Sequence, residues 1–379
     1  MKIKKVLQIS KFLTPPYGGI ENHVESLCKY LKSYKPILLT STKKQDSFEI
    51  NNLKSYEVNL VRSYGKFLSV ELSPNIYFKG NKMIADGKVD IVHGHLPNPW
   101  VNLLIQSNTN CPSLVTWHSD VIRQKFSKFF YNFLQKTTLK KVDRIIVPSE
   151  AHYNSSNFLQ SLKIENKISF IPIGIEIDNL KKEEEIDNEF IETIKSKISN
   201  KKVILTIGRH VYYKGYEYLI KSLKTVDKDA ILIMVGEGPL TKKLKYIVKT
   251  YSLESKVLML KNLKRNQLKY LYKICDIFTL PSIERTEAFG IVSAEAMVFK
   301  KPTVVCDLKN GVNDLNKNEY NSLYAKLRTP DDLSDKLNYL IKNEDYAKKL
   351  GENGYKHVND NYDFNKVAVE IEKVYCSIL

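Results

Sequence analysis

Short runs of β-branched and aliphatic residues alternate along this chain with longer stretches of helical spacing, and few folds accommodate that order. In the first half, the runs 6–10, 36–40 and 113–117 show the pattern most clearly. Alternation of this kind predicts βαβ units, and therefore a parallel sheet covered by helices. The remaining runs of this half are 90–93, 144–147 and 168–171.

The second half repeats the scheme, which indicates two α/β domains of one class. Its β-rich runs are 203–208, 230–235, 257–260, 276–281 and 303–306. A chain of 379 residues is too long for one ordinary core but suits two domains of roughly 180 residues. We place the boundary in the charged stretch 181–185, and so expect doubly wound domains at 1–180 and 181–362. Ligands bind beyond the carboxyl ends of such strands, so a cleft between the domains is the expected active site.

Composition and the first residues bear on the compartment. No run of about 18 apolar residues occurs, and a charged start leads directly into a strand without a signal-peptide pattern. The five cysteines are scattered and form no CxxC pair, which predicts reduced thiols rather than disulfides or a zinc site. We therefore expect a cytoplasmic protein.

The formal net charge of +17 favours a phosphate-bearing substrate, a nucleic acid or an anionic lipid as partner. A lysine-rich solvated surface would account for much of the same excess. The segment 121–144 is more specific, because it holds seven basic side chains against one acid, Asp143, with aromatic residues between them. That composition is typical of a basic amphipathic helix on an anionic membrane. The residues that we expect on the acceptor or membrane side here are Asp120, Arg123, Lys125, Phe126, Lys128 and Phe129.

Two motifs at strand ends have the chemistry of phosphate binding. Gly18 and Gly19 open a helical stretch where backbone N–H groups can approach a phosphate, although a turn that binds nothing can also need glycine. After the run ending at Gly208, Arg209 and Lys214 place a guanidinium and an ammonium a short loop apart. Such a pair can neutralise a diphosphate leaving group, although two solvated loop cations would look the same.

The strongest motif is a pair of carboxylates, Glu287 and Glu295, eight positions apart. A turn ending at Gly290 follows the first acid, and the second lies in the otherwise apolar run 291–297. Glu287 and the backbone N–H groups of the turn can face a sugar, while Glu295 can receive two ribose hydroxyls. A surface helix with stray acids is the plain alternative, but an acid in an apolar run needs a partner because burying a lone charge is costly.

Histidines follow two β-rich runs of the first half. His93 and His95 lie at the end of one run and just beyond it, and His118 follows another. His93 and His95 can ligate a metal, but no third ligand is evident. We therefore expect no metal, and assign His95 an acceptor-side or structural role.

Taken together, these motifs resemble those of the family 4 glycosyltransferases. The spacing of the two glutamates looks like the family's E-x7-E motif, and the early glycine pair, the loop of Arg209 and Lys214 and the turn at Gly236 follow in the family's order over most of the chain. The resemblance implies a GT-B fold, with two Rossmann-like domains facing across a cleft and the segment 363–379 crossing back to the first domain as a helix. After the last β-rich run the family usually has a glycine-rich turn, whereas only Gly311 is present here, which predicts altered backbone contacts to the donor phosphates.

The resemblance also implies residue roles. Arg209 and Lys214 would hold the donor diphosphate, Glu295 the ribose and Glu287 the donor sugar. The loop of His118 looks like that of bacterial mannosyltransferase-like members that build surface polysaccharides, in which a histidine lies by the donor sugar. The expected catalytic residues are His118, Arg209, Lys214 and Glu287. The expected donor-binding residues are Gly18, Gly19, Gly208, Arg209, Lys214, Gly236, Ala288, Phe289, Gly290, Ile291 and Glu295.

The activity implied by the resemblance is retaining transfer of a hexose. Mannose from GDP-mannose is the first choice and a UDP-hexose the alternative, with a glycan or polyprenyl-linked acceptor of an O-antigen, capsule or exopolysaccharide at the inner face of the cytoplasmic membrane. No metal or cofactor is expected, because Arg209, Lys214 and backbone donors can stabilise the leaving group. A nucleotide-sugar epimerase of the same fold is a weaker alternative, since it needs neither the paired glutamates nor the basic aromatic segment. Only the net charge favours a nucleic acid, so we expect no such partner.

Overall fold

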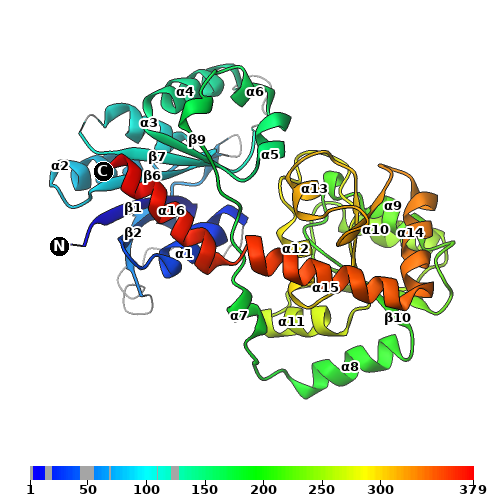
Figure 1. The fold of residues 1–379 in the computed structure, drawn as a ribbon. Helices are drawn as coiled ribbons and strands as arrows, with labels where there is room; N and C mark the ends of the chain where they lie inside the picture. The colour runs from blue at the N-terminus through cyan, green and yellow to red at the C-terminus, as the bar shows by residue number, and fades with distance from the viewer. Residues whose placement is uncertain (1–2, 13–18, 43–54, 68–69, 109, 121–127) are drawn as a thin grey trace. The chain divides into compact units, whose positions relative to one another are not determined.

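The computed structural model describes residues 3–12, 19–42, 55–67, 70–108, 110–120 and 128–379. The chain forms two compact units, one of Met1–Gly174 with Phe364–Leu379 and one of Ile175–Asp363. Each unit is a parallel sheet with helices on both faces, which confirms the predicted fold class (Figure 1). The division lies at Gly174 rather than at residue 180, because α7 (Ile177–Lys181) packs on α12 (Ile291–Val298) of the second unit.

The first unit contains a seven-stranded parallel sheet with the order β3-β2-β1-β6-β7-β8-β9. Its strands are β1 (Lys5–Phe12), β2 (Lys35–Thr42), β3 (Glu57–Arg62), β6 (Ile91–Leu96), β7 (Ser113–Trp117), β8 (Arg144–Val147) and β9 (Ile168–Phe170). Its helices are α1 (Gly19–Tyr30), α2 (Asn75–Ala85), α3 (Pro99–Ser107), α4 (Lys128–Lys141), α5 (Glu150–Ser155), α6 (Asn157–Gln160) and α16 (Phe364–Ile378). A separate two-stranded hairpin joins β4 (Lys66–Phe67) to β5 (Val70–Glu71).

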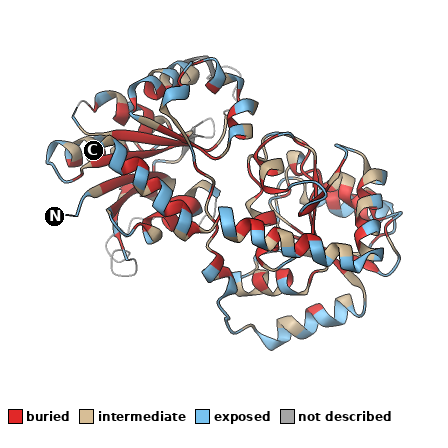
Figure 2. Ribbon diagram, in the orientation of Figure 1, coloured by how far each residue is buried: buried red, intermediate tan, exposed pale blue. Residues whose placement is uncertain are grey.

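Alternating residues of β1 supply two different cores. Leu7 and Ile9 pack with the side chains of α2 and α3, whereas Val6 faces the opposite layer with Leu27 of α1 and Ile371 of α16. Figure 2 shows the resulting pattern, in which the central strands of the sheet are buried and helices such as α16 keep an exposed outer face. Burial of both sheet faces explains why these strands have nearly continuous apolar sequences.

The C-terminal helix α16 belongs to the first unit, as the resemblance predicted. Its apolar side chains lie against α1 and β1, and its N-terminal residue Phe364 is fully buried. On its outer side, Glu372 Oε1 accepts hydrogen bonds from the backbone N–H groups of Lys32 (2.7 Å) and Ser33 (2.8 Å), just after α1. The helix therefore completes one face of the first sheet.

The second unit contains a six-stranded parallel sheet with the order β12-β11-β10-β13-β14-β15. Its strands are β10 (Lys202–Ile207), β11 (Ala230–Val235), β12 (Val257–Leu260), β13 (Ile277–Leu280), β14 (Thr303–Cys306) and β15 (Ser322–Ala325). Besides α7 and α12, its helices are α8 (Asn188–Ile198), α9 (Tyr216–Ser222), α10 (Thr241–Thr250), α11 (Arg265–Ile274), α13 (Gly311–Leu315), α14 (Pro330–Lys342) and α15 (Glu344–Asn361). In the part of the chain that the structure describes, no helix combines the length and apolarity needed to cross a membrane.

Candidate functional site

The polar residues selected in the second half gather at the carboxyl ends of β10, β11 and β13. Gly208 follows β10 directly, and Gly236 follows β11. A Cβ atom at Gly236 would lie 2.1 Å from the carbonyl oxygen of Gly208, and Gly236 has a φ of +133°. Only glycine allows these two loops to meet backbone against backbone, which keeps their surface free of side chains.

Lys214 and Glu287 form a buried ion pair at this edge of the sheet. Lys214 ends a short 3₁₀ turn after β10, and its Nζ lies 2.6 Å from Glu287 Oε2, with side-chain exposures of 9% and 12%. Ser282 Oγ donates a hydrogen bond of 2.9 Å to the same carboxylate oxygen. Burial alone would lower the pKa of Lys214, but the Glu287 carboxylate outweighs it and raises the pKa above its ordinary value. Lys214 therefore carries its charge at neutral pH.

The turn between the two glutamates is held by glycine and asparagine. Gly290 has a φ of +77° and precedes α12, and Asn310 Nδ2 donates a hydrogen bond of 2.7 Å to the carbonyl oxygen of Glu287. Phe289 is buried against Tyr362, with ring centroids 5.6 Å apart. Among the described residues, no hydrogen bond engages the backbone N–H groups of 288–290. These N–H groups are available to an anionic or hydroxylated ligand.

Glu295 has the partner that its position in an apolar run required. Tyr272 Oη of α11 donates a hydrogen bond of 2.8 Å to Glu295 Oε2. Burial raises the pKa of Glu295, and the hydrogen bond from Tyr272 opposes that shift. Ile291, at the start of the same helix, is partly exposed. No feature of the sequence around Tyr272 predicted that it would be the partner.

Arg209 and His210 differ sharply although they are adjacent. The Arg209 side chain is exposed, and no ion pair within the described residues involves it. His210 is fully buried, and its Nδ1 lies 2.9 Å from Thr241 Oγ1, which itself accepts a hydrogen bond from the Gly238 backbone N–H. His210 Nε2 has no hydrogen-bond partner in the described structure. The sequence motifs predicted no role for His210. In the structure, its unpartnered Nε2 marks it as a candidate ligand-binding group.

In the first unit, four histidines are buried side by side near the carboxyl ends of the central strands. They are His23 of α1, His93 and His95 of β6, and His118 just after β7. His95 Nδ1 lies 3.0 Å from His118 Nε2, and the rings of His93 and His95 stack with centroids 4.4 Å apart. Burial lowers the pKa of His93 to about 3 and holds that of His95 well below the usual range. The cluster is therefore neutral at pH 7.

A hydrogen-bond chain from α16 fixes the tautomers in this cluster. Gln8 Nε2 donates to Tyr375 Oη at 2.8 Å, so its Oε1 is the atom that faces His95 Nε2 at 3.0 Å. Because a carboxamide oxygen only accepts, His95 has its proton on Nε2 and presents the Nδ1 lone pair to His118. Tyr375 Oη also lies 2.7 Å from His93 Nδ1.

The structure describes only some of the residues that we expect on the acceptor or membrane side. His95 is only 1% exposed and lies in the histidine cluster, and its acceptor-side or structural role stays a prediction. Asp120 Oδ1 accepts hydrogen bonds from Trp117 Nε1 (3.2 Å) and Ser156 Oγ (2.7 Å), which makes it a local structural contact. The other expected residues of this region are outside the described residues (Gly18, Arg123, Lys125 and Phe126) or begin α4 without described side chains (Lys128 and Phe129). Gly19 is the first residue of α1.

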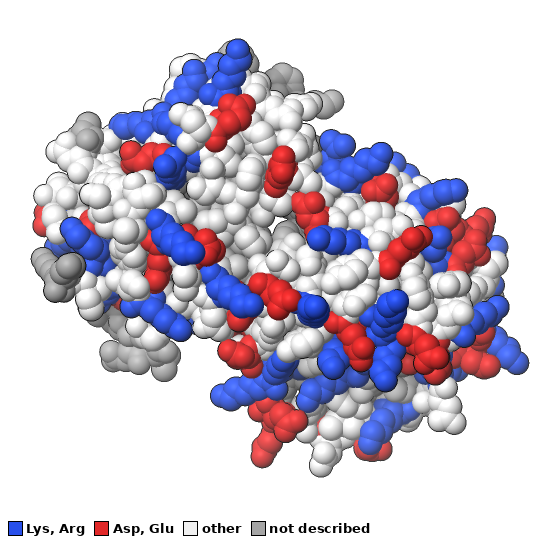
Figure 3. Space-filling model, in the orientation of Figure 1, with Lys and Arg blue, Asp and Glu red and all other residues white. Residues whose placement is uncertain are grey.

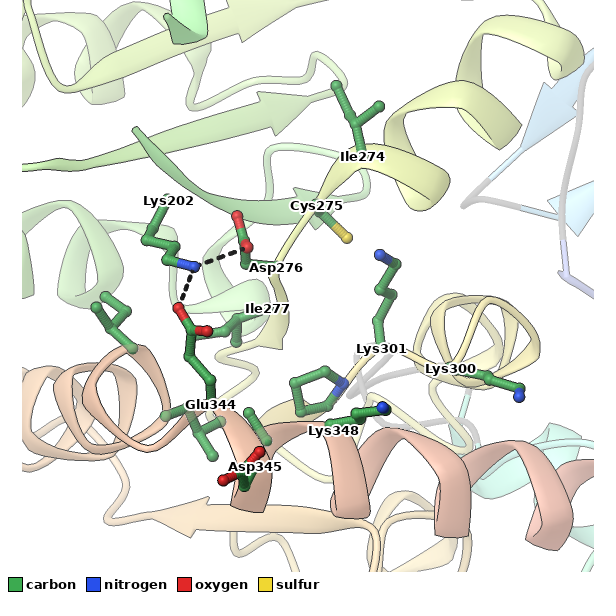
Figure 4. A pocket seen from close by; sticks show the side chains of 14 residues that line it. Lys202, Ile274, Cys275, Asp276, Ile277, Lys300, Lys301, Glu344, Asp345 and Lys348 are labelled. Carbon is green, nitrogen blue, oxygen red and sulfur yellow. Dashed lines mark hydrogen bonds and ion pairs between the residues drawn. The ribbon is translucent and has the colours of Figure 1, made fainter. Parts of the chain in front are cut away.

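A separate pocket opens at the opposite edge of the second sheet (Figure 4). Lys202, at the start of β10, points toward Asp276 and Glu344, with Nζ 3.6 Å and 2.6 Å from their carboxylate oxygens. Pro302 and Ile277 also line it, at the amino ends of β14 and β13. It is therefore distinct from the residues selected by sequence, which lie at the carboxyl ends.

The family models and curated relatives that this chain matches are glycosyltransferases. Residues 187–357 match the family model described as "Glycosyl transferases group 1", and residues 17–179 match that described as "Glycosyltransferase Family 4". The chain is 31% identical to the uncharacterized glycosyltransferase MJ1178 of Methanocaldococcus jannaschii, over 99% of each protein. It is 26% identical to the O-antigen chain mannosyltransferase C of Escherichia coli, over 79% of this chain and 78% of that protein.

The fold is also similar to that of a solved structure. Anabaena Alr3699/HepE, crystallised in complex with UDP, has a TM-score of 0.79 and 18% sequence identity, covering 98% of this chain and 100% of that one. At this identity the likeness shows the fold alone.

Proposed function

Because the chain belongs to the group 1 glycosyltransferases, we propose that it transfers a hexose, with retention, from a nucleoside diphosphate sugar to a glycan or polyprenyl-linked acceptor. GDP-mannose is the proposed donor and a UDP-hexose the second candidate. The proposed destination is a surface polysaccharide such as an O-antigen, a capsule or an exopolysaccharide. The observation that carries this proposal is the charged edge of the second sheet, where the Lys214–Glu287 pair, Arg209 and free backbone N–H groups lie together.

This edge suits a diphosphate leaving group. As the bond between the sugar and the diphosphate breaks, negative charge develops on the departing phosphate, and preorganised cations stabilise it most effectively where water is scarce. Lys214 is such a cation, since it is buried and held by Glu287. The exposed Arg209 adds a guanidinium that can contact two phosphate oxygens. We propose that these groups and the N–H groups of 288–290 make an added metal ion unnecessary for transfer.

The two glutamates then divide the donor between them. Glu287, fixed by Ser282 and Lys214, would accept hydrogen bonds from hydroxyls of the donor sugar. Glu295, held by Tyr272, would accept those of the ribose. In the proposed reaction the acceptor hydroxyl attacks on the face that the diphosphate leaves, and the diphosphate takes its proton. The protein would contribute mainly positioning and exclusion of water.

The donor assignment depends on the first unit. The similarity to an O-antigen chain mannosyltransferase supports mannose, and we propose that His118 lies beside the donor sugar. His118 is neutral because burial holds its pKa well below the usual range. It would therefore act as a hydrogen-bonding group toward a sugar hydroxyl and not as a cation.

A membrane surface is the proposed meeting place with a lipid-linked acceptor. Basic side chains gather over the region of α4 in Figure 3, whereas basic and acidic side chains alternate over the second unit. One side of α4 packs on α3, since Gln106 Nε2 donates to the Leu134 carbonyl oxygen at 3.2 Å. Phe133 is 62% exposed on the same helix and would be in a position to enter the lipid interface.

The test is ligand-induced thermal stabilisation of the full chain by GDP, UDP, ADP and their sugar conjugates, without divalent ions. A ligand that binds only the folded state raises the melting temperature by mass action. We expect one nucleotide class to stabilise the protein, and Arg209→Ala and Glu295→Gln to lose the shift. Lys249→Ala, which removes an exposed cation from the far end of α10, is the matched control and should keep it.

Transfer is then measured with the selected donor and a polyprenyl-linked acceptor in the presence of chelator. The product should form under these conditions with the anomeric configuration of the donor. Absence of stabilisation by every nucleotide would refute the proposal, and an inverted product would refute its retaining mechanism. Strict dependence of transfer on added Mn²⁺ would refute the metal-free site.

A further inference from the structure

Three of the buried histidines converge, and the proposed reaction uses only one of them, His118. His23 of α1, His95 of β6 and His118 after β7 each offer a ring nitrogen, and these nitrogens all lie within 4.8 Å of one another. They come from separate elements, so their approach results from the packing of α1 against the sheet. Nothing in the sequence around His93 and His95 indicated a third ligand, whereas the fold supplies two more histidines.

The spacing of the rings is that of ligands around one small ion. A tetrahedral ion with metal–nitrogen distances of about 2.0–2.1 Å places its imidazole nitrogens roughly 3.3 Å apart and the ring centres roughly 5 Å apart. Here the ring centroids are 5.3 Å apart for His95 and His118, 5.3 Å for His23 and His118, and 5.9 Å for His23 and His95. The candidate nitrogens lie within 4.8 Å of one another, so binding of an ion would bring the more distant ones closer together.

The hydrogen bonds of His23 and His95 also favour a metal site. Neither ring nitrogen of His23 has a hydrogen-bond partner in the part of the chain that the structure describes, although the side chain is only 5% exposed. A buried polar group without a partner calls for a physical explanation, and a bound ion is one that fits this position. His95 donates its Nε2 proton to Gln8 Oε1 and turns the Nδ1 lone pair toward the cluster. Metal-binding histidines are oriented in this way by a second hydrogen bond.

Charge and ligand type select the class of ion. Histidines bind metal ions through a neutral ring nitrogen, and each of these three side chains offers one. Within the described residues the cluster contains no carboxylate. Neutral nitrogen ligands suit Zn²⁺, Ni²⁺ and Co²⁺ and do not suit Mg²⁺ or Ca²⁺, which prefer oxygen. The positive charge of Lys11 near His118 opposes binding of a cation.

We propose that His23, His95 and His118 form a binding site for a divalent transition-metal ion of the zinc class, with one coordination position left open. Binding replaces the hydrogen bond between His95 and His118, and the Nε2 proton of His118 moves to Nδ1. A consequence that rests on the proposed function is inhibition: an ion held by His118 withdraws that side chain from the donor sugar. The ion is thus not a cofactor of transfer but competes with it.

The site is tested on the full, untagged chain after removal of metal with chelator and dialysis. Titration with Co²⁺ should give the visible absorption of a tetrahedral nitrogen site, saturating at one equivalent, and Zn²⁺ should displace it. Mg²⁺ should have no effect. His23→Gln should weaken binding at least tenfold, and because His23 makes no hydrogen bond in the described structure, the variant should fold, which circular dichroism checks. His357→Gln, a buried histidine of the second unit, is the matched control and should bind as the parent does.

Two results would overturn the proposal: the lack of saturable Co²⁺ and Zn²⁺ binding, or binding that His23→Gln leaves unchanged. The activity assay separates this proposal from the transferase proposal. If the site exists and the chain is not a transferase, the Co²⁺ spectrum appears without any transfer. If the chain is a transferase and the site does not exist, transfer occurs and Zn²⁺ produces neither the one-equivalent binding nor an inhibition that His23→Gln relieves.

Discussion

Acidification should destabilise the first unit through its buried histidines, and His23 allows the effect to be calculated. Burial lowers the pKa of His23 from 6.5 to about 4. The unfolded chain therefore takes up a proton near pH 6.5, while the folded chain takes it up only near pH 4. Because the unfolded state binds more protons between these values, stability must fall as the pH falls through this window. His93, His95 and His118, which face His23, shift in the same direction and add to the loss.

The contribution of His23 follows from linkage between its two pKa values. With 6.5 in the unfolded state and about 4 in the folded state, the free energy of unfolding falls by about 2 kcal/mol between pH 7 and pH 5, and by about 3 kcal/mol at pH 4. A His23→Gln variant lacks this titration. The stability difference between the parent and the variant should therefore change by these amounts over the same window, in favour of the variant at low pH.

The assay is urea unfolding of both proteins at several pH values, in the presence of chelator, followed by tryptophan fluorescence. Trp100 and Trp117 are the two tryptophans of the chain, and both lie in the first unit, so the signal reports on the unit that contains His23. Parallel stability curves for parent and variant from pH 7 to pH 4 would show that His23 titrates as it does in water. That result would refute the burial argument.

Two further predictions concern the second unit. Lys214→Met should lower the free energy of unfolding of this unit by about 3–5 kcal/mol, because Glu287 is left buried without its partner. In urea unfolding followed by circular dichroism, the double variant Lys214→Met with Glu287→Gln should recover part of this loss. A loss below about 1 kcal/mol for Lys214→Met, the size expected of a surface ion pair, would contradict this. Tyr272→Phe should weaken nucleotide binding by roughly tenfold in calorimetry, because its hydrogen bond to the Glu295 carboxylate contributes about 1.5–3 kcal/mol and orients that side chain. Tyr270→Phe on the same helix is the control. Equal nucleotide affinities for both variants would show that Tyr272 does not position Glu295 for binding.

The strands could be predicted because their sequences are buried on both faces. Every β-rich run named from the sequence is a strand in the structure, from β1 to β14. The strands β3 and β15, each at the edge of its sheet, and the hairpin of β4 and β5 were not predicted. Glu57–Arg62 mixes charged and apolar residues, and Ser322–Ala325 contains no β-branched residue. Propensity carries little information in such segments, because pairing with a neighbouring strand decides their conformation.

The charged site was more predictable than the histidine cluster. Glycine turns, cations and paired acids at strand ends are local in sequence, and the structure collects Arg209, Lys214 and Glu287 at one sheet edge. His23 is different, because its meaning depends on which elements pack against α1. A signal was nevertheless present: His23 stands three residues after Ile20 and one before Val24, on the apolar face of the predicted helix. A histidine on that face is buried and must find partners elsewhere in the fold.

The return of the chain to the first unit has a physical role beyond covering a sheet face. Phe364, at the start of α16, lies 5.5 Å from the His23 ring, and Tyr375, near its end, bonds to both Gln8 and His93. Without the Tyr375 hydroxyl, Gln8 Nε2 and His93 Nδ1 would be buried without these partners, and the orientation of Gln8 that fixes the His95 tautomer would be lost. The last residues of the chain therefore determine which nitrogen of His95 faces His118, and with it whether that pair can hold a proton or an ion.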